Sequence, residues 1–336
     1  MAGAAGRICS VPDYKLIALD IDGTLLTSQR TISARTRHAL ASAVERGVTL
    51  AIATGRRRRT ARPIVEQLGL PHYLVVSQGA AVWQDGQVIH HSHLPRDAAR
   101  DALEIIRAHG LCTAILSNAL LPEHEEVIWA DGDWRSNPRL ADYLTRNQPW
   151  VRDFEPAALA HDPIEFIVMD DLGRLEALDR ALTGHPAPPP AEDAPAQPGP
   201  RPEAPRWRVI FSRNQFTAGG AIEVVGPTTS KAAALQVLCD RLGITRDEVM
   251  AFGDNVNDVE MLEFAGLGVA MGNATDDVKA LIRRRGARGR ITASNDEDGI
   301  ALVLEQELRL AHPSSAASRS CAIASQEKRW STSRRP

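Results

Sequence analysis

Short apolar segments that end at polar or glycine-rich turns constrain the fold of this chain more than any other feature. Five segments have this form: residues 15–20, 48–55, 72–79, 248–254 and 265–272. Their apolar runs lack the strict alternation of a half-exposed strand, as expected for strands that are covered on both faces. Segments with helical periodicity lie between them. This order predicts an α/β fold with a doubly wound parallel sheet.

Helical periodicity is clearest near residue 40 and after residue 230. The first of these stripes consists of Ala39, Leu40, Ala43 and Val44. It ends at Gly47, and a second stripe within residues 232–242 ends at Gly243. Because glycine commonly follows the last residue of a helix, we expect each helix to end at its glycine.

The middle of the chain has a different pattern. Asp85 and Gly86 lie between apolar flanks, which is typical of a tight hairpin turn, and further strand-like and helix-like segments follow. We interpret residues 85–225 as an inserted α+β cap with an antiparallel sheet. Residues 13–84 and 226–311 then form the core.

Three segments are expected to lack a packed structure. Residues 186–205, inside the predicted cap, are rich in proline, which predicts a flexible excursion. Residues 1–12 are expected to be a disordered N-terminal segment. Residues 312–336, rich in Ser, Arg and Ala, are expected to be a disordered C-terminal tail.

Composition and charge narrow the class of function. A hydrophobic content of 43% and a charged content of 24% are ordinary for a soluble protein, and a net charge of −3 creates no field that attracts nucleic acid or anionic membrane. No apolar run approaches the roughly 20 residues that span a bilayer, and no signal-peptide core is present. The scattered cysteines favour a reducing compartment. We expect a cytoplasmic monomer or weak homodimer that binds neither nucleic acid nor membrane.

Polar side chains gather where the predicted parallel strands end. Four groups follow strands: Asp20 and Asp22, then Thr54 and Gly55, then Ser77 and Gln78, then Asp254, Asn255, Asn257 and Asp258. Lys231, one of only four lysines in the chain, begins a predicted helix. Because ligands bind beyond the carboxyl ends of the strands in open parallel sheets, we expect these side chains to converge.

The residue types in this group favour phosphoryl transfer. Neighbouring carboxylates repel each other unless a positive charge lies between them, and Mg²⁺ prefers a few carboxylates together with substrate phosphate. One carboxylate can attack phosphorus, and a second can transfer the proton. A hydroxyl, backbone amides and a lysine can hold the phosphoryl oxygens.

Four segments in order resemble the motifs of haloacid dehalogenase-like phosphatases. They are DIDGTLL at 20–26, ATGR at 53–56, Lys231 within TTSKAAAL, and GDNVND at 253–258. The run GVAMGNATDDVKA followed by TASNDEDGIALVLE is similar to the Cof-type subfamily. That subfamily carries a large α+β cap between its second and third motifs, where this chain has its unusual middle.

The resemblance implies a role for each matching residue. Asp20 would be the nucleophile and a Mg²⁺ ligand, and Asp22 would be the general acid/base, with its backbone carbonyl on the metal. Asp254 would complete the metal site. The residues that bind phosphate would be Ile21, Thr54, Gly55, Lys231 and Asn257. Asn255 and Asp258 would support them, with Asp258 positioning Lys231 or the metal's waters.

Two positions depart from the family pattern, and one charged run has a simpler interpretation. Gln78 stands where relatives usually have Asn, and Ala232 follows the lysine where Gly is usual. The four arginines at 56–59 are interpreted as a solvated helix start, although one of them could sense substrate phosphate.

The leading hypothesis is a Mg²⁺-dependent phosphatase that hydrolyses a small phosphorylated metabolite through an aspartyl-phosphate intermediate. Sugar phosphates, flavin mononucleotide and pyridoxal phosphate are the candidate substrates. A phosphomutase or phosphotransferase of the same fold is one alternative. A catalytically silent regulator that binds a phosphorylated metabolite is the other.

Overall fold

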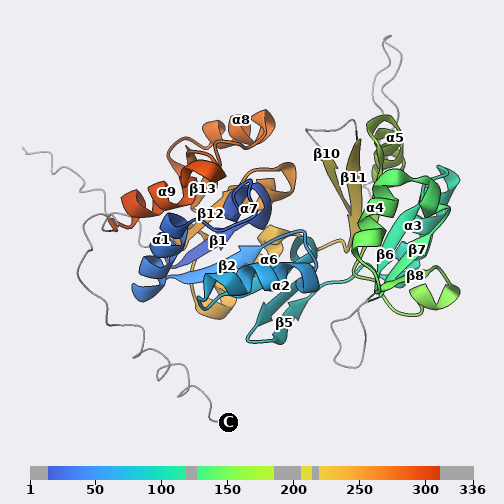
Figure 1. The fold of residues 1–336 in the computed structure, drawn as a ribbon, viewed down its shortest axis with the longest axis horizontal. Helices are drawn as coiled ribbons and strands as arrows, with labels where there is room; N and C mark the ends of the chain where they lie inside the picture. The colour runs from blue at the N-terminus through green and yellow to red at the C-terminus, as the bar shows by residue number, and fades with distance from the viewer. Residues whose placement is uncertain (1–13, 118–126, 185–205, 214–218, 311–336) are drawn as a thin grey trace, which may run out of the picture.

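The structure is a computed structural model that describes residues 14–117, 127–184, 206–213 and 219–310 (Figure 1). It contains an eight-stranded sheet in the order β14-β13-β12-β1-β2-β3-β4-β5 and a six-stranded sheet in the order β10-β11-β9-β6-β7-β8. The predicted tails and the proline-rich excursion lie outside the described residues. The two ends of the described chain share the larger sheet, and its middle forms the smaller one.

The larger sheet confirms the predicted parallel architecture. Its strands are β1 (Leu16–Leu19), β2 (Thr49–Ala53), β3 (Tyr73–Val76), β4 (Ala81–Gln84), β5 (Gln87–His91), β12 (Val249–Gly253), β13 (Leu267–Ala270) and β14 (Gly289–Ile291). The strands from β14 to β3 pair in parallel, and β4 and β5 add an antiparallel hairpin. The turn of this hairpin is at Asp85 and Gly86, as predicted, and both residues have a positive φ.

Helices cover both faces of this sheet, so its central strands are buried on both sides. The helices are α1 (Ala34–Glu45), α2 (Arg58–Val65), α6 (Lys231–Leu242), α7 (Val259–Phe264), α8 (Asp276–Arg284) and α9 (Gly299–Glu307). The central strands β1, β3, β12 and β13 are fully buried, whereas the edge strands β5 and β14 are partly exposed. In β1, Ile17 and Leu19 pack with residues of α1, α2 and α9. Leu16 and Ala18 pack with residues of α6, α7 and α8 on the opposite face. This two-sided burial explains the uninterrupted apolar runs of the sequence.

The smaller sheet is mainly antiparallel, as predicted for the middle of the chain. Its strands are β6 (Thr113–Leu116), β7 (Ile128–Asp131), β8 (Val151–Asp153), β9 (Glu165–Asp171), β10 (Arg208–Arg213) and β11 (Gly219–Val225), and only β7 and β8 pair in parallel among the described strands. Helices α3 (Arg96–Ala108) and α5 (Leu172–Thr183) pack on one face, and α4 (Pro138–Arg146) packs on part of the other. The uncovered part of that second face borders the pocket described below.

The border between the two sheets differs from the predicted start of the cap at residue 85. Strand β5 pairs with β4 and extends the larger sheet, so the change of sheet comes after His91. On the return, β11 ends at Val225 and α6 begins at Lys231. The bounds of the core and cap as domains remain a prediction. Within the described ranges, no helix combines the length and apolar character that crossing a bilayer requires.

Candidate active site

Asp20 lies at the carboxyl end of β1, in the centre of the larger sheet. Its backbone N–H donates to the Phe252 carbonyl of β12 at 3.1 Å, and the residue is only 5% exposed. Gly23 follows in the next turn with a φ of 77°. A Cβ at this glycine would collide with the Asp254 carboxylate. The turn after β1 therefore requires glycine, both for its left-handed backbone and for the close approach of Asp254.

Lys231 joins two buried carboxylates. Its Nζ donates to Asp20 Oδ1 at 2.7 Å and to Asp258 Oδ1 at 2.6 Å. Lys231 is 2% exposed and Asp258 is fully buried. Burial alone would lower the pKa of Lys231, but the charges of Asp20 and Asp258 outweigh burial and raise it. The lysine is therefore charged, and it offsets part of the repulsion between the carboxylates.

Helix α6 places Lys231 at its first residue. Ser230 caps the helix, because its Oγ accepts from the backbone N–H of Ala233 at 3.0 Å. The loop of Gly79 lies directly against this helix start, and a Cβ at Gly79 would collide with the Ser230 carbonyl. Ala232, which departs from the family pattern, is accommodated in the first turn of a regular helix.

Asp258 also holds the loop that carries Asp254. Its Oδ2 accepts from the backbone N–H groups of Asp254, at 3.0 Å, and Asn255, at 3.2 Å. A Cβ at Gly253 would lie only 2.5 Å from the Asp258 Cβ, so the glycine permits this packing. Asp258 thus uses both carboxylate oxygens within the protein, which agrees with the supporting role expected for it.

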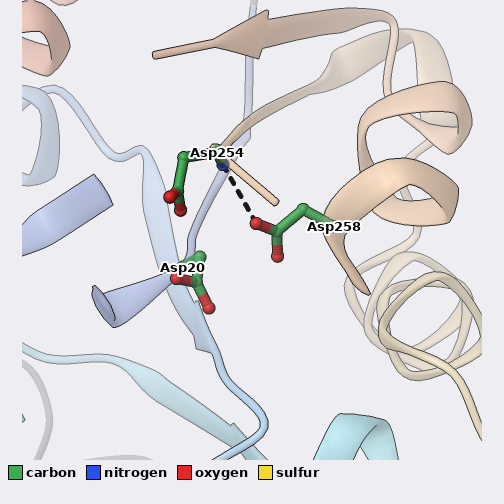
Figure 2. Close-up of side chains that lie close together, drawn as sticks. All are labelled: Asp20, Asp254 and Asp258. Atoms are coloured by element: carbon green, nitrogen blue, oxygen red, sulfur yellow. Dashed lines mark hydrogen bonds between the residues drawn. The ribbon is translucent and has the colours of Figure 1, made fainter. Parts of the chain in front are cut away.

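The carboxylates of Asp20, Asp254 and Asp258 point toward one another (Figure 2). One oxygen of each lies within 4.8 Å of the others. Burial, followed by the charge of Asp258, raises the pKa of Asp254 to about 7 and the pKa of Asp20 well above its usual range. Thr24 Oγ1 donates to Asp254 Oδ1 at 3.1 Å and opposes that rise.

This donor set fits a hard divalent cation. Carboxylate oxygens are the ligands that Mg²⁺ prefers, and a cation between Asp20 and Asp254 would reduce the repulsion that remains beside Lys231. Asp20 and Asp254 are the candidates to hold it, because both oxygens of Asp258 already accept hydrogen bonds from Lys231 and the backbone.

Thr54 and Gly55 lie at the end of β2, beside the carboxylates. Thr54 is 1% exposed, and its Oγ1 accepts from the Arg56 backbone N–H at 3.1 Å. A Cβ at Gly55 would collide with the Gln78 side-chain amide. That amide accepts from Asn257 Nδ2 at 3.4 Å through its Oε1. Gln78 therefore belongs to this site, although its role could not be inferred from the sequence.

Asp22 has a more open position than Asp20. Its carboxylate forms a bidentate ion pair with Arg56, with Nε–Oδ2 and Nη2–Oδ1 distances of 2.5 Å. The Asp22 side chain is 56% exposed, whereas that of Asp20 is 8% exposed. Asp22 therefore lines the more exposed part of the pocket.

The interpretation of residues 56–59 as a solvated helix start is wrong for the first two arginines. Arg56 pairs with Asp22, and Arg57 is 5% exposed and donates to the side chain of Asn147. Arg58 and Arg59 begin α2, with their guanidinium groups over the rings of Trp83 and Trp150. These partners lie far from the arginines along the chain, so a local pattern does not reveal them.

A pocket of about 490 Å³ lies between the two sheets. Six of the residues that the sequence predicted line it: Asp20, Asp22, Thr54, Gly55, Asn255 and Asn257. Lys231 lies behind Asp20 and donates hydrogen bonds to both Asp20 and Asp258. Asp258 in turn accepts a hydrogen bond from the backbone N–H of Asp254. The side chain of Ile21 is buried in the hydrophobic core, so only its backbone can serve phosphate.

Residues from the smaller sheet and α4 complete the pocket, and sequence reasoning did not identify them. They include Tyr143, Asn147, Ile167, Met169, Ser212 and Glu223. In β9, alternate residues share this face, so a period of two was the available signal. A period of two does not tell which face of a strand meets the core, so it could not identify these residues as pocket residues.

Comparisons with known proteins identify the family of the chain. A family model described as haloacid dehalogenase-like hydrolase matches residues 17–189 and 201–304. A 5-amino-6-(5-phospho-D-ribitylamino)uracil phosphatase of Bacillus subtilis is 30% identical over 86% of this chain and 94% of its own length. An HMP-PP phosphatase of Serratia proteamaculans is 31% identical over 80% of this chain and 88% of its own length.

Solved structures show the same fold. A haloacid dehalogenase-like hydrolase from Bacteroides thetaiotaomicron matches with a TM-score of 0.64 and 26% sequence identity. The match covers 87% of this chain and 99% of that protein.

Proposed function

The chain belongs to the haloacid dehalogenase-like hydrolase family, in its Cof-type branch, and from this premise we propose that it is a Mg²⁺-dependent phosphatase with an aspartyl-phosphate intermediate. It is a phosphoric monoester hydrolase, as its relatives are, and its substrates are small phosphorylated metabolites. The dependence on Mg²⁺ and the aspartyl-phosphate intermediate do not follow from family membership and are proposed here.

One observation carries the proposal: Lys231 lies buried between Asp20 and Asp258, at 2.7 Å and 2.6 Å. Burying three charged groups is costly, and folding alone does not require it. A lysine beside a carboxylate at the end of a pocket is suited to hold a phosphoryl oxygen while that carboxylate attacks phosphorus.

In the first step, an Asp20 carboxylate oxygen attacks phosphorus, and the bond from phosphorus to the leaving oxygen breaks. Asp22, protonated once it has left its ion pair with Arg56, gives its proton to that oxygen, so the leaving group departs as a neutral alcohol. Lys231, Thr54 and the backbone N–H groups near Ile21 and Gly55 hold the phosphoryl oxygens.

In the second step, a water attacks the phosphorus of the aspartyl-phosphate. The Asp22 carboxylate takes a proton from this water, the bond from Asp20 to phosphorus breaks, and inorganic phosphate leaves. Asp20 returns as a carboxylate and Asp22 as an acid. The exposed position of Asp22 lets it reach both the leaving oxygen and the incoming water.

Asp20, Asp254 and the backbone carbonyl of Asp22 would hold Mg²⁺. The bound ion would supply positive charge that offsets the repulsion among these carboxylates and the substrate phosphate. A bound cation would oppose the rise that burial and the charge of Asp258 give to the pKa values of Asp20 and Asp254.

Candidate substrates remain sugar phosphates, flavin mononucleotide and pyridoxal phosphate. The substrates in the relatives' names, a phosphorylated ribitylamino-uracil and HMP-PP, are small phosphorylated metabolites too. We propose as well that the protein is cytoplasmic and is a monomer or a weak dimer.

The test is a phosphate-release screen of the full-length protein on a panel of phosphomonoesters, with Mg²⁺ and with EDTA. We expect release that requires Mg²⁺. No release from any panel member would contradict the proposal. Transfer of the phosphoryl group to an added sugar alcohol, in place of release, would favour the phosphotransferase alternative, and tight binding without turnover would favour the silent regulator.

A further inference from the structure

Glu223 is the carboxylate that the smaller sheet contributes to the pocket from β11. It lies directly opposite Ile167 of β9 in the antiparallel ladder, and both residues line the pocket. The next row of the same face contains Met169 and Ser212, which pair with Ala221. Glu223 therefore projects from the face that also carries Ile167, Met169 and Ser212. The rest of this side of the pocket is lined by Tyr143, Arg146, Asn147 and Glu165.

A contact from the larger sheet holds the Glu223 carboxylate in place. Gln78 Nε2 donates to Glu223 Oε2 at 2.5 Å, while Gln78 Oε1 accepts from Asn257. Gln78 thus links Glu223 to residues that surround the predicted phosphate position. Its φ of 57° and the absence of a side chain at Gly55 shape the backbone around this amide.

The position of Glu223 is unsuited to catalysis of the phosphoryl step but suited to recognition. Gln78 lies between it and the residues at the end of β2. An ionised carboxylate in this wall loses part of its hydration, and its pKa is raised to about 7 chiefly by burial. A hydrogen-bond donor on a bound molecule would restore that lost interaction.

We propose that Glu223, positioned by Gln78, is a specificity-determining residue that accepts a hydrogen bond from a hydroxyl or ammonium group on the leaving group of the phosphomonoester. The proposal rests on the proposed phosphatase function and names the substrate class of the same site. The substrate is then a phosphomonoester with hydrogen-bond donors beyond the ester oxygen, and Ile167 and Met169 contact its carbon skeleton.

The same geometry disfavours two kinds of substrate. A purely alkyl leaving group would leave the carboxylate without a donor, and a second anionic group at this position would face the charge of Glu223. Discrimination by a buried polar group is strong, because a mismatched ligand leaves that group without its partner.

The test compares sorbitol 6-phosphate with hexyl phosphate, which have the same six-carbon chain and differ in hydroxyl groups. The third substrate is 6-aminohexyl phosphate, which tests an ammonium donor, and p-nitrophenyl phosphate reports phosphatase activity itself. The wild type is expected to prefer at least one donor-bearing substrate over hexyl phosphate by about tenfold or more in kcat/KM, the scale of one hydrogen bond to a charged group.

The variant E223Q keeps the size of the side chain and removes its charge. We expect it to lower that preference by about tenfold while hydrolysis of hexyl phosphate changes little. The matched control is E176Q, since Glu176 is exposed on α5 of the same region and pairs with Arg213. It should keep the preference of the wild type.

Q78N tests the positioning role, because the shorter amide cannot reach Glu223 and still bond Asn257. It should reduce the preference mainly through a higher KM for the donor-bearing substrate, and add little to E223Q in the double variant. A wild type without the preference, or an E223Q variant that keeps it, overturns the inference. Absence of p-nitrophenyl phosphate hydrolysis by the wild type would instead overturn the proposed function.

Discussion

The two walls of the pocket are built in different ways. On the larger sheet, the carboxylates of Asp20, Asp254 and Asp258 are held by Lys231, Thr24 and backbone N–H groups. On the smaller sheet, Glu223 stands beside Ile167, Met169 and Ser212, and Gln78 from the opposite wall holds it. The first wall is an interlocked charge network, whereas the second combines the apolar Ile167 and Met169 with polar side chains that come from several separate elements.

The difference shows how this pocket divides chemistry from recognition. An interlocked network keeps each group in position before a substrate arrives, which transition-state stabilisation requires. The second wall depends on how the two sheets sit together. Contacts between the two regions include the polar pairs of Arg57 with Asn147 and Arg208 with Glu260, and the apolar packing of Ala80 with residues of the smaller sheet.

The largest effect on activity is expected when the nucleophile is removed from the first wall. D20N should lower kcat/KM by at least about 10³-fold, because an amide cannot form the covalent intermediate. Steady-state kinetics and thermal unfolding measure the loss and the retained fold. D247N, at an exposed ion pair with Arg288, is the control. An active D20N protein would remove Asp20 from the role of nucleophile.

Removing the central cation should destabilise the first wall itself. K231M leaves Asp20 and Asp258 buried without their cation, and loss of one partner from a buried pair costs about 3–5 kcal/mol in the free energy of unfolding. Urea denaturation measures this change, and activity should be lost too. K279M, a lysine on α8 outside the pocket, should change stability little. Equal stability of K231M and the wild type would show that the network is not interlocked.

Mg²⁺ should stabilise the first wall through Asp254. At a concentration 100 times the dissociation constant, binding should add about 2.7 kcal/mol to the free energy of unfolding. Because the pKa of Asp254 is about 7 and the metal binds the carboxylate, this gain should grow as the pH rises through that value. Thermal unfolding with Mg²⁺ or EDTA measures it. A D254N variant that gains as much would contradict the assignment.

The second wall should respond to pH with the opposite sign. Burial raises the pKa of Glu223 from 4.5 to about 7, so between these values the folded state holds a proton that the unfolded state has lost. The free energy of unfolding therefore falls as the pH rises through this window. E223Q removes the effect and should be more stable than the wild type by about 1–2 kcal/mol at pH 8, with no gain at pH 4.

Urea denaturation at several pH values measures this difference, and E176Q is again the control. A gain by E223Q that does not depend on pH would show that Glu223 is not the titrating group. Because Glu223 lies in the second wall, this result also tells whether the wall excludes water enough to shift its pKa.

The smallest expected effect concerns the contact between the walls. Arg208 and Glu260 form a partly exposed ion pair that joins β10 to α7. R208M should lower the free energy of unfolding by less than about 1 kcal/mol, since exposed pairs contribute little. Chemical denaturation checks this. A larger loss would mean that this ion pair contributes more to joining the walls than an exposed pair usually does.

The first wall was largely predictable from the sequence. Asp20, Thr54 and Asp254 each follow a strand of the parallel sheet, and parallel strands bring their carboxyl ends to one edge. A short spacing such as that from Asp254 to Asp258 lies within one turn and is visible in the sequence. The partner of Asp22 was not, because a run of four arginines does not reveal which one turns inward.

The second wall could not be predicted in this way. Glu223 looks like one acidic residue in an apolar strand, and the pattern leaves open whether it faces water or the pocket. Its partner Gln78 is 145 residues away in the sequence. Only the pairing of β11 with β9, and the packing of that sheet against the core, bring the two side chains together.

By itself the sequence determined the parallel sheet, the inserted antiparallel region and the charged group at the strand ends. Those features depend on local periodicity and on the rule that parallel strands end at a common edge. The tertiary structure decided which arginines are buried, where the sheets divide after His91, and which residues of the smaller sheet enter the pocket. These depend on the face that each strand presents and on contacts between distant segments, which a local pattern does not encode.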